Sequence, residues 1–148
     1  MNTKTQDQST LLPLETELYL AIQQKASLLQ EQVMKLLRPY QLSTSQYNIM
    51  RILRGAGKNG CTCGEIAWRM MTKDPDITRL LDRLEQREYI ARTRSESDRR
   101  VVKSFITKQG LELLKQLDEP IKRLHEQQFN GFNAQQKQQL KKWLDRMV

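Results

Sequence analysis

The stretch Ile77-Thr78-Arg79-Leu80-Leu81-Asp82-Arg83-Leu84-Glu85 decides the fold prediction, because its apolar and charged residues separate onto two faces. The apolar residues recur three and four positions apart, which is the spacing of one face of an α-helix. We predict a helix capped by Asp74, with Pro75 in its first turn, that reaches about Glu88. Its outward positions are then Asp76, Thr78, Arg79, Asp82 and Arg83.

Two further helices precede this one, and each begins at a pattern typical of helix starts. Ser43-Thr44-Ser45-Gln46 and Thr62-Cys63-Gly64-Glu65 both fit a capping box, in which a hydroxyl and a carboxylate or amide satisfy each other's backbone donors. Three glycines at 55, 57 and 60 separate the two helices. We expect the second helix to be short and to end at Met71.

A β-hairpin is expected directly after the charged helix. Residues 89–94 and 101–107 are rich in β-branched and aromatic residues, and the polar run 95–100 between them is typical of a turn. The hairpin carries five basic residues, namely Arg92, Arg94, Arg99, Arg100 and Lys103. Such a tip suits the narrow, electronegative minor groove of DNA. Asp98 is expected to pair with and orient a neighbouring arginine.

Three short helices followed by a hairpin is the order of a winged helix-turn-helix, whose last helix enters the major groove. Arginine can bind guanine through two hydrogen bonds, and threonine can contact a phosphate or a thymine methyl group. The predicted DNA-binding residues are Ser43, Thr62, Asp76, Thr78, Arg79, Arg83, Arg94, Asp98, Arg99, Arg100 and Lys103. The alternative for the helix is an ordinary solvated face, where arginines are common.

Helices are also expected at both ends of the chain. The first runs from about Leu14 to Arg38 and is ended by Pro39; others follow caps at Thr107 and Asn133. Their apolar stripes are larger than a monomer usually exposes, which indicates a dimer interface, with packing inside one chain as the alternative. The predicted dimerisation residues are Leu18, Ile22, Leu117, Ile121, Leu124, Trp143 and Leu144.

The predicted fold class is therefore mostly α with a small β-hairpin wing. We divide the 148 residues into an N-terminal arm and dimerisation helix (1–40), a winged helix-turn-helix (41–108) and C-terminal dimerisation helices (109–148), intertwined as one domain. Because no stretch of about 18 apolar residues occurs and the start lacks the apolar core of a signal peptide, we expect a cytoplasmic protein.

The formal net charge is +8, and the excess begins after residue 40. A basic surface attracts nucleic acid or an anionic membrane. The sequence has one histidine, His125, and no Gly-rich phosphate loop or catalytic constellation, so we expect neither an enzyme nor a bound cofactor or metal.

Cys61 and Cys63 leave an alternative open, since a cysteine at a helix start can have a depressed pKa. Two thiols and one distant histidine are nevertheless a poor zinc set. We expect packing roles for both cysteines, with a redox- or metal-gated regulator as the alternative.

These motifs resemble those of the MarR family of winged helix-turn-helix transcriptional regulators. The segments 43–46, 63–67 and 77–85 are similar to its successive helices, and Asp98-Arg99-Arg100 with Ile106-Thr107 and Gly110 resembles its wing and the exit from it. One departure is Glu88, which stands where the family commonly has a glycine, so the entry to the wing is expected to be angled differently.

The resemblance implies a homodimer on a pseudo-palindromic DNA operator, with Arg100 in the minor groove. It also implies a small aromatic effector, for which we predict a pocket formed by Tyr19, Tyr40, Tyr47, Met50 and Trp68, although aromatic residues at helical spacing also build cores. The expected function is a repressor that the effector releases from DNA. The alternatives are the redox- or metal-gated regulator and a winged-helix protein-interaction module without specific DNA binding.

Overall fold

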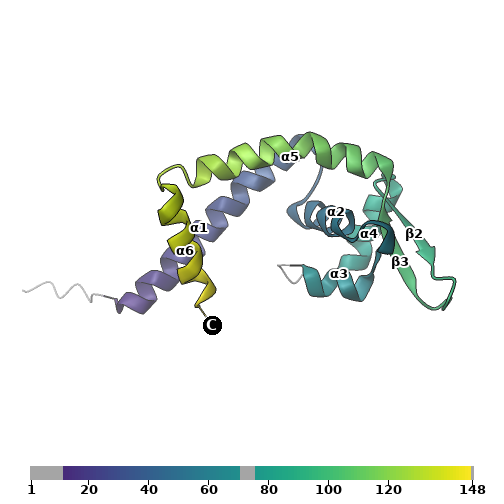
Figure 1. Ribbon diagram of the computed structural model, residues 1–148, viewed down its shortest axis with the longest axis horizontal. Coiled ribbons are helices and arrows are strands. Elements are labelled where there is room, and N and C mark those ends of the chain that lie inside the picture. The colour runs from purple at the N-terminus through teal and green to yellow at the C-terminus, as the bar shows by residue number, and fades with distance from the viewer. Residues whose placement is uncertain (1–11, 71–75, 148) are drawn as a thin grey trace, which may run out of the picture.

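The computed structural model describes residues 12–70 and 76–147 and confirms the predicted fold class. Its α-helices are α1 (Leu14–Leu37), α2 (Thr44–Ala56), α3 (Cys63–Arg69), α4 (Ile77–Gln86), α5 (Lys108–Gln128) and α6 (Ala134–Asp145). The strands are β1 (Cys61–Thr62), β2 (Ile90–Arg94) and β3 (Val102–Ile106), and the short 3₁₀ segments are η1 (Arg38–Tyr40) and η2 (Gly57–Asn59). Helix α5 spans the molecule from the wing to α6 (Figure 1).

Local capping signals place most of the helix starts. Ser43, Thr62 and Asn133 form complete capping boxes, and the hydroxyl of Thr107 accepts from the amide of Gly110 at 3.0 Å. In the second box the backbone N–H of Thr62 donates to the carboxylate of Glu65, which lowers the pKa of that carboxyl. Each box satisfies amides at a helix start that have no partner inside the helix.

Helix α4 differs from the prediction at both of its ends. It begins at Ile77, and the side chain of Asp76 is its N-cap, accepting from the amide of Arg79 at 3.2 Å. The predicted cap Asp74, Pro75 and the predicted end of α3 at Met71 lie outside the described residues. Helix α4 ends at Gln86, two residues earlier than predicted, and the short turn after it leads into the wing.

Glu88 adopts a backbone conformation that usually requires a glycine. Its φ is +59°, in the left-handed region. The amide of Glu88 donates to Glu85 O at 2.9 Å and the amide of Tyr89 to Leu84 O at 3.0 Å, which is a Schellman motif. The hydroxyl of Thr107 donates to the carbonyl of Glu88 at 2.6 Å. The chain therefore makes the turn into the wing that a glycine would permit, at the expense of strain in a non-glycine residue.

The sheet holds one strand more than the predicted hairpin. Its order is β1-β3-β2, both pairs are antiparallel, and Ser104 lies opposite Arg92 on one side and Cys61 on the other. A two-residue strand such as β1 has too few residues to show an alternating pattern in the sequence. It fixes the base of the wing to the start of α3.

Buried side chains of α2, α4, α5 and the sheet form the core of the winged part, and the exit from the wing packs closely on it. Leu53, Leu84 and Leu114 are fully buried there. A Cβ at Gly110 would overlap the carbonyl oxygen of Tyr89 and lie 2.9 Å from Ile106 Cγ1. The first turn of α5 therefore approaches the wing entry more closely than any side chain would allow.

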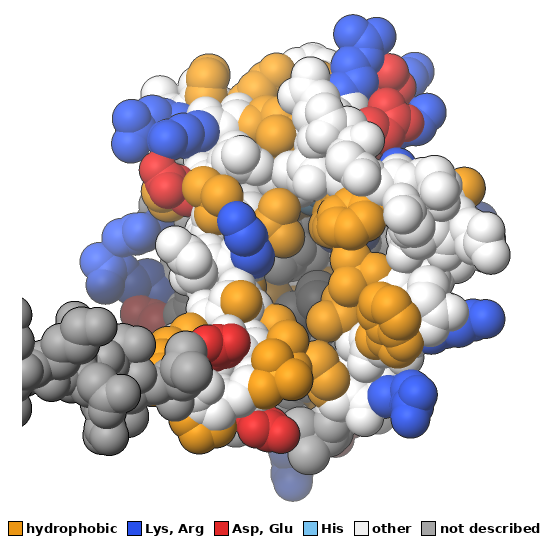
Figure 2. Space-filling view, turned by 90° about the vertical axis from the view of Figure 1, so that its left-hand side faces the viewer, with side chains coloured by type: hydrophobic (Ala, Val, Ile, Leu, Met, Phe, Trp, Pro, Cys, Tyr) orange, Lys and Arg blue, Asp and Glu red, His pale blue; other side chains and the backbone are white. Residues whose placement is uncertain are grey.

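The two terminal helices have few buried residues. Helix α1 ends one residue before the predicted Arg38, because the chain tightens into η1 around Pro39, and only Leu37 of α1 is buried. Helix α6 buries none of its residues. Figure 2, which faces the end of the molecule formed by α1 and α6, shows hydrophobic side chains gathered on that surface.

Candidate nucleic-acid interface

Helix α4 presents a row of polar side chains on the side opposite its buried face. Ile77, Leu81 and Leu84 are buried, whereas Leu80, which was predicted to be buried with them, is half-exposed. On the other face the side chains of Thr78, Arg79 and Arg83 are exposed. Arg79 also lies 3.9 Å from the carboxylate of Asp76. The helix thus exposes two guanidinium groups and a hydroxyl on one surface.

Two of the charged residues assigned to the outer surface instead hold the wing on α4. The Nε of Arg92 donates to Glu85 at 2.8 Å, and its Nη2 donates to Asp82 at 2.6 Å and also to Glu85. The hydrogen bond to Glu85 raises the pKa of Arg92 above its usual value. Asp82 is therefore not a free outward position, and Arg92 is not a free basic residue of the wing. These bonds join β2 to the middle of α4.

The tip of the wing keeps three of its five basic side chains exposed, namely Arg94, Arg99 and Arg100. Asp98 bonds to the backbone of Arg100 and not to the guanidinium group with which it was expected to pair: its Oδ1 accepts from the amide of Arg100 at 2.9 Å. The amide of Ser95 donates to Val101 O at 2.8 Å and closes the turn. The carboxylate thus shapes the turn that presents the arginines.

The remaining predicted DNA contacts have internal hydrogen bonds. Lys103 reaches back from β3 and donates to the carbonyl of Asn59 at 3.1 Å. The hydroxyls of Ser43 and Thr62 accept from the amides of Gln46 and Glu65 at the starts of α2 and α3. Both hydroxyls lie at helix N-termini, where backbone amides favour an anion.

The five residues assigned to an effector pocket are not brought together. Tyr19 is exposed on α1, Trp68 is 86% exposed on α3, and Met50 is fully buried in the core. Tyr40, in η1, packs partly against the core, which leaves Tyr47 as the only one of the five, among the described residues, that lines the hollow between α2, α5 and α6. The helical spacing identified amphipathic faces, but the faces of different helices point in different directions.

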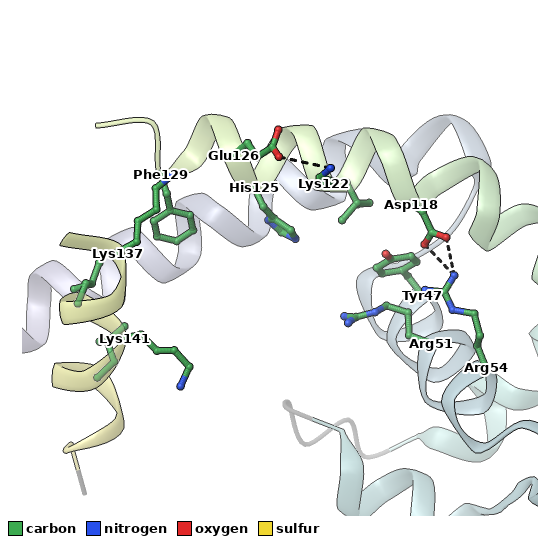
Figure 3. Close-up of a pocket in the computed structure, with 13 residues that line it drawn as sticks. Tyr47, Arg51, Arg54, Asp118, Lys122, His125, Glu126, Phe129, Lys137 and Lys141 are labelled. Carbon is green, nitrogen blue, oxygen red and sulfur yellow. Dashed lines mark hydrogen bonds and ion pairs between the residues drawn. The ribbon is translucent and has the colours of Figure 1, made fainter. Parts of the chain in front are cut away.

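That hollow has a volume of about 710 Å³ and lies between α2, α5 and α6. Lys141 of α6 and Arg51 of α2 extend into it from opposite sides, and His125 extends into it from α5 (Figure 3). Arg54 donates to both carboxylate oxygens of Asp118 at 2.9 Å, which ties α2 to α5 at one edge. Burial raises the pKa of Tyr47 above its ordinary value. The remaining lining combines four apolar side chains with three charged ones, namely Ile121, Phe129, Leu140 and Leu144 with Lys122, Glu126 and Lys137.

The predicted dimerisation residues divide into two groups. Leu18, Ile22, Trp143 and Leu144 are exposed, with Leu18 at 53% and Trp143 at 57%. Leu117 and Ile121 are instead buried in the core of the same chain, and Leu124 is half-exposed. The assignment of Leu117 and Ile121 to a dimer surface was therefore wrong, because the inner face of α5 covers the core of its own chain.

The two cysteines differ in their surroundings. Cys61 is buried in β1, where burial raises the pKa of its thiol, and Arg69 lies 3.7 Å from its sulfur. Cys63 is exposed in the first turn of α3. Among the described residues, no cluster of three or more histidine, cysteine or acidic side chains could hold a metal ion. No helix in the same part of the chain is long and apolar enough to cross a membrane.

Sequence reasoning missed Arg87, which makes hydrogen bonds to two carbonyl groups before α2. Its Nη1 donates to Gln41 O at 2.7 Å and its Nη2 to Tyr40 O at 2.9 Å. The partners lie 46 and 47 positions away along the chain, so no local pattern could have revealed the contact.

A helix pair with an exposed cationic row, followed by a basic wing, defines a winged helix-turn-helix protein. Residues 42–102 match the model of the MarR family. A MarR transcription factor from Planctomyces limnophilus is 34% identical, with 93% of this chain and 99% of that chain covered and a TM-score of 0.71. The chain therefore belongs to the MarR family of transcription regulators.

Two other comparisons cover less of the sequence or show the fold alone. The repressor MdtR of Bacillus subtilis is 30% identical over 66% of this chain and 61% of its own length. The first curated relatives are thus matched over less than two thirds of their length. Staphylococcus aureus MepR, solved in complex with DNA, is 18% identical with a TM-score of 0.78, and 93% of this chain and 97% of that chain are covered.

Proposed function

We propose that this chain is a sequence-specific DNA-binding regulator that occupies a pseudo-palindromic operator as a homodimer. In this proposal α4 lies in the major groove and the wing tip in the minor groove. The observation that supports it is that both elements expose arginines: Arg79 and Arg83 on α4, and Arg99 and Arg100 at the wing. The two surfaces are joined by the bonds of Arg92, so they would approach one duplex as a unit.

Homodimer formation is supported by the apolar surface of the terminal helices. Leu18 and Ile22 of α1 and Trp143 and Leu144 of α6 are exposed large hydrophobic residues. A group of large hydrophobic side chains exposed together is typical of an interaction surface, and a twofold interface would bury it on both copies. A dimer also supplies two recognition helices, as a palindromic site requires.

The hollow between α2, α5 and α6 is the best candidate for an effector site that relieves repression. Its size is in the range of small-molecule pockets. The apolar lining with Phe129 suits an aromatic ring, and Arg51 and Lys141 favour an acidic substituent. An effector bound there would weaken DNA binding only if it prefers one arrangement of α5 relative to α2. Lys141→Ala, at an exposed position that lines the hollow, should then reduce the effect of an acidic effector without abolishing DNA binding.

The decisive experiment is fluorescence anisotropy with DNA fragments selected from genomic DNA by the purified full-length protein. Wild-type protein should bind a selected site more tightly than scrambled DNA. Affinity should fall steeply as salt rises, since each phosphate contact adds about 0.9 to the slope of log K against log salt. Arg100→Ala should weaken binding, whereas Arg123→Ala, which removes an exposed arginine of α5, should not.

Two outcomes would contradict the proposal. If selection yields no preferred site and wild-type protein does not distinguish sequences, the chain is better described as a protein-interaction module. If Trp143→Asp leaves the protein a dimer in sedimentation at micromolar concentration, the α1–α6 surface is not the interface.

A further inference from the structure

The guanidinium group of Arg87 joins three segments that are far apart in the chain. Besides its bonds to the carbonyls of Tyr40 and Gln41, its Nη2 donates to the hydroxyl of Tyr89 at 3.3 Å. The guanidinium also lies 4.8 Å from the centre of the Tyr89 ring, in the geometry of a cation–π contact. Arg87 itself is the C-cap of α4. The end of the recognition helix, the wing entry and the turn after α1 therefore meet at one side chain.

The carbonyl groups that Arg87 binds lie where helices leave acceptors without partners. Tyr40 is the last residue of η1, and Gln41 is its C-cap with a φ of +53°. Carbonyls at such an end lack intrahelical donors and carry the negative end of the helix dipole. Arginine can satisfy two of them at once because its donors form a rigid planar fork. Lysine, with a single ammonium group, cannot reproduce this geometry.

The bonds of Arg87 affect how α4 is oriented relative to α1. Helix α1 carries the apolar surface through which we propose that two copies pair, and α4 is the helix that we propose enters the major groove. The segment η1 follows α1 directly, so a bond from α4 to η1 ties the direction of α4 to that of the pairing helix. In a dimer, this direction decides the spacing and angle between two recognition helices.

We propose that Arg87 is a positioning residue that sets the half-site spacing which the dimer recognises. The proposal rests on the proposed function, since it concerns DNA that the dimer reads. Arg87 does not need to contact DNA for this role. Its loss would leave α4 held by the buried contacts of Leu81 and Leu84, which anchor the helix but leave its angle to α1 less restricted.

The test compares binding of wild-type protein and Arg87→Met to the selected operator and to the same operator with one base pair added or removed at its centre. Wild-type affinity should fall about tenfold or more on the altered sites, because a rigid dimer cannot follow the displaced half-site. Arg87→Met should lose about threefold or less between the same sites, with weaker binding to the original one. Arg87→Lys should behave like the methionine variant, and Arg123→Ala like wild type.

A second measurement tests, without DNA, whether Arg87 links η1 to the end of α4. The amide of Gln41 donates to Arg38 O, and that of Tyr89 donates to Leu84 O. Hydrogen exchange should accelerate around both amides together in Arg87→Met, while the middle of α5 stays protected. A merely local role in α4 would accelerate exchange around Tyr89 alone.

Each outcome supports or overturns the proposal. An unchanged penalty for altered spacing in Arg87→Met overturns it, even if overall affinity falls. A salt slope reduced by about one phosphate contact, with the spacing penalty kept, would make Arg87 a DNA contact and also overturn it. If wild-type protein prefers no DNA sequence, the proposed function fails first; the exchange measurement then still supports or refutes the link between η1 and α4.

Discussion

Replacing Glu88 by glycine should stabilise the protein, because Glu88 holds a backbone conformation that a side chain disfavours. Its φ of +59° lies in the left-handed region, where a Cβ costs about 1–2 kcal/mol. Glycine removes that cost but brings about 0.5–1 kcal/mol of extra conformational entropy in the unfolded chain. The two Schellman hydrogen bonds and the bond from Thr107 use backbone atoms of residue 88 or its neighbours, so glycine keeps them.

Taken at their midpoints, these two effects differ by about 0.75 kcal/mol, which is the expected gain in the free energy of unfolding. For a chain of this size the gain corresponds to a rise in Tm of about 1–4 °C. Urea denaturation at a fixed protomer concentration should show a higher midpoint with an unchanged m-value. The concentration must be held constant because association of folded chains also adds stability.

The matched control is Glu88→Ala, which removes the same exposed carboxylate but keeps the Cβ and therefore the strain. We expect its stability to stay within about 0.5 kcal/mol of wild type. A second control, Gln86→Gly, places glycine two residues earlier, at the last residue of α4, and should destabilise by up to about 1 kcal/mol. If Glu88→Gly is no more stable than Glu88→Ala, backbone strain at the wing entry is not what limits stability there.

Three further predictions concern the core, the wing and the hollow. Arg92→Met should lower the free energy of unfolding by about 1 kcal/mol, a small value because the carboxylates that Arg92 binds are partly exposed. A double-mutant cycle with Glu85→Gln should show coupling between the two residues, and additive effects would contradict the bond between them. Gly110→Ala should cost about 2–3 kcal/mol by forcing a methyl group into the wing-entry backbone, whereas Gly131→Ala, with open space around it, should stay near wild type in the same denaturation assay. Burial raises the pKa of Tyr47 above 10.0, so the folded state holds the phenol proton more tightly. The stabilisation is complete below pH 10.0 and is lost as the pH rises through the folded-state pKa, and Tyr47→Phe should flatten this alkaline decline; an identical decline in both proteins would refute the assignment.

The basic residues of the wing illustrate how far composition alone can mislead about a surface. Five cations lie in the hairpin, and a count treats them as equivalent. Arg92 is held by Asp82 and Glu85, and Lys103 by the carbonyl of Asn59, which leaves three exposed arginines at the tip. A long charged side chain bonds to whatever the fold brings near it, and the sequence does not state which groups those are.

The local structure of this protein follows from its sequence, because the forces that decide it act within about four residues. The caps at Ser43, Thr62, Thr107 and Asn133 each place a side-chain oxygen against the amide three residues ahead, so they were predicted at the right positions. The order of helices followed by a hairpin, and with it the fold class, followed from the same short-range signals.

The tertiary structure decided which surface each apolar face meets and which groups hold helix α4. The same periodicity gives both α5 and α6 an apolar face. Leu117 of α5 is nevertheless buried by its own chain, whereas Trp143 of α6 is exposed. The bonds of Arg87 to residues 40 and 41 join positions that lie 47 and 46 residues apart along the chain. Contacts at such separation depend on the path of the backbone between the partners, and only the folded chain determines that path.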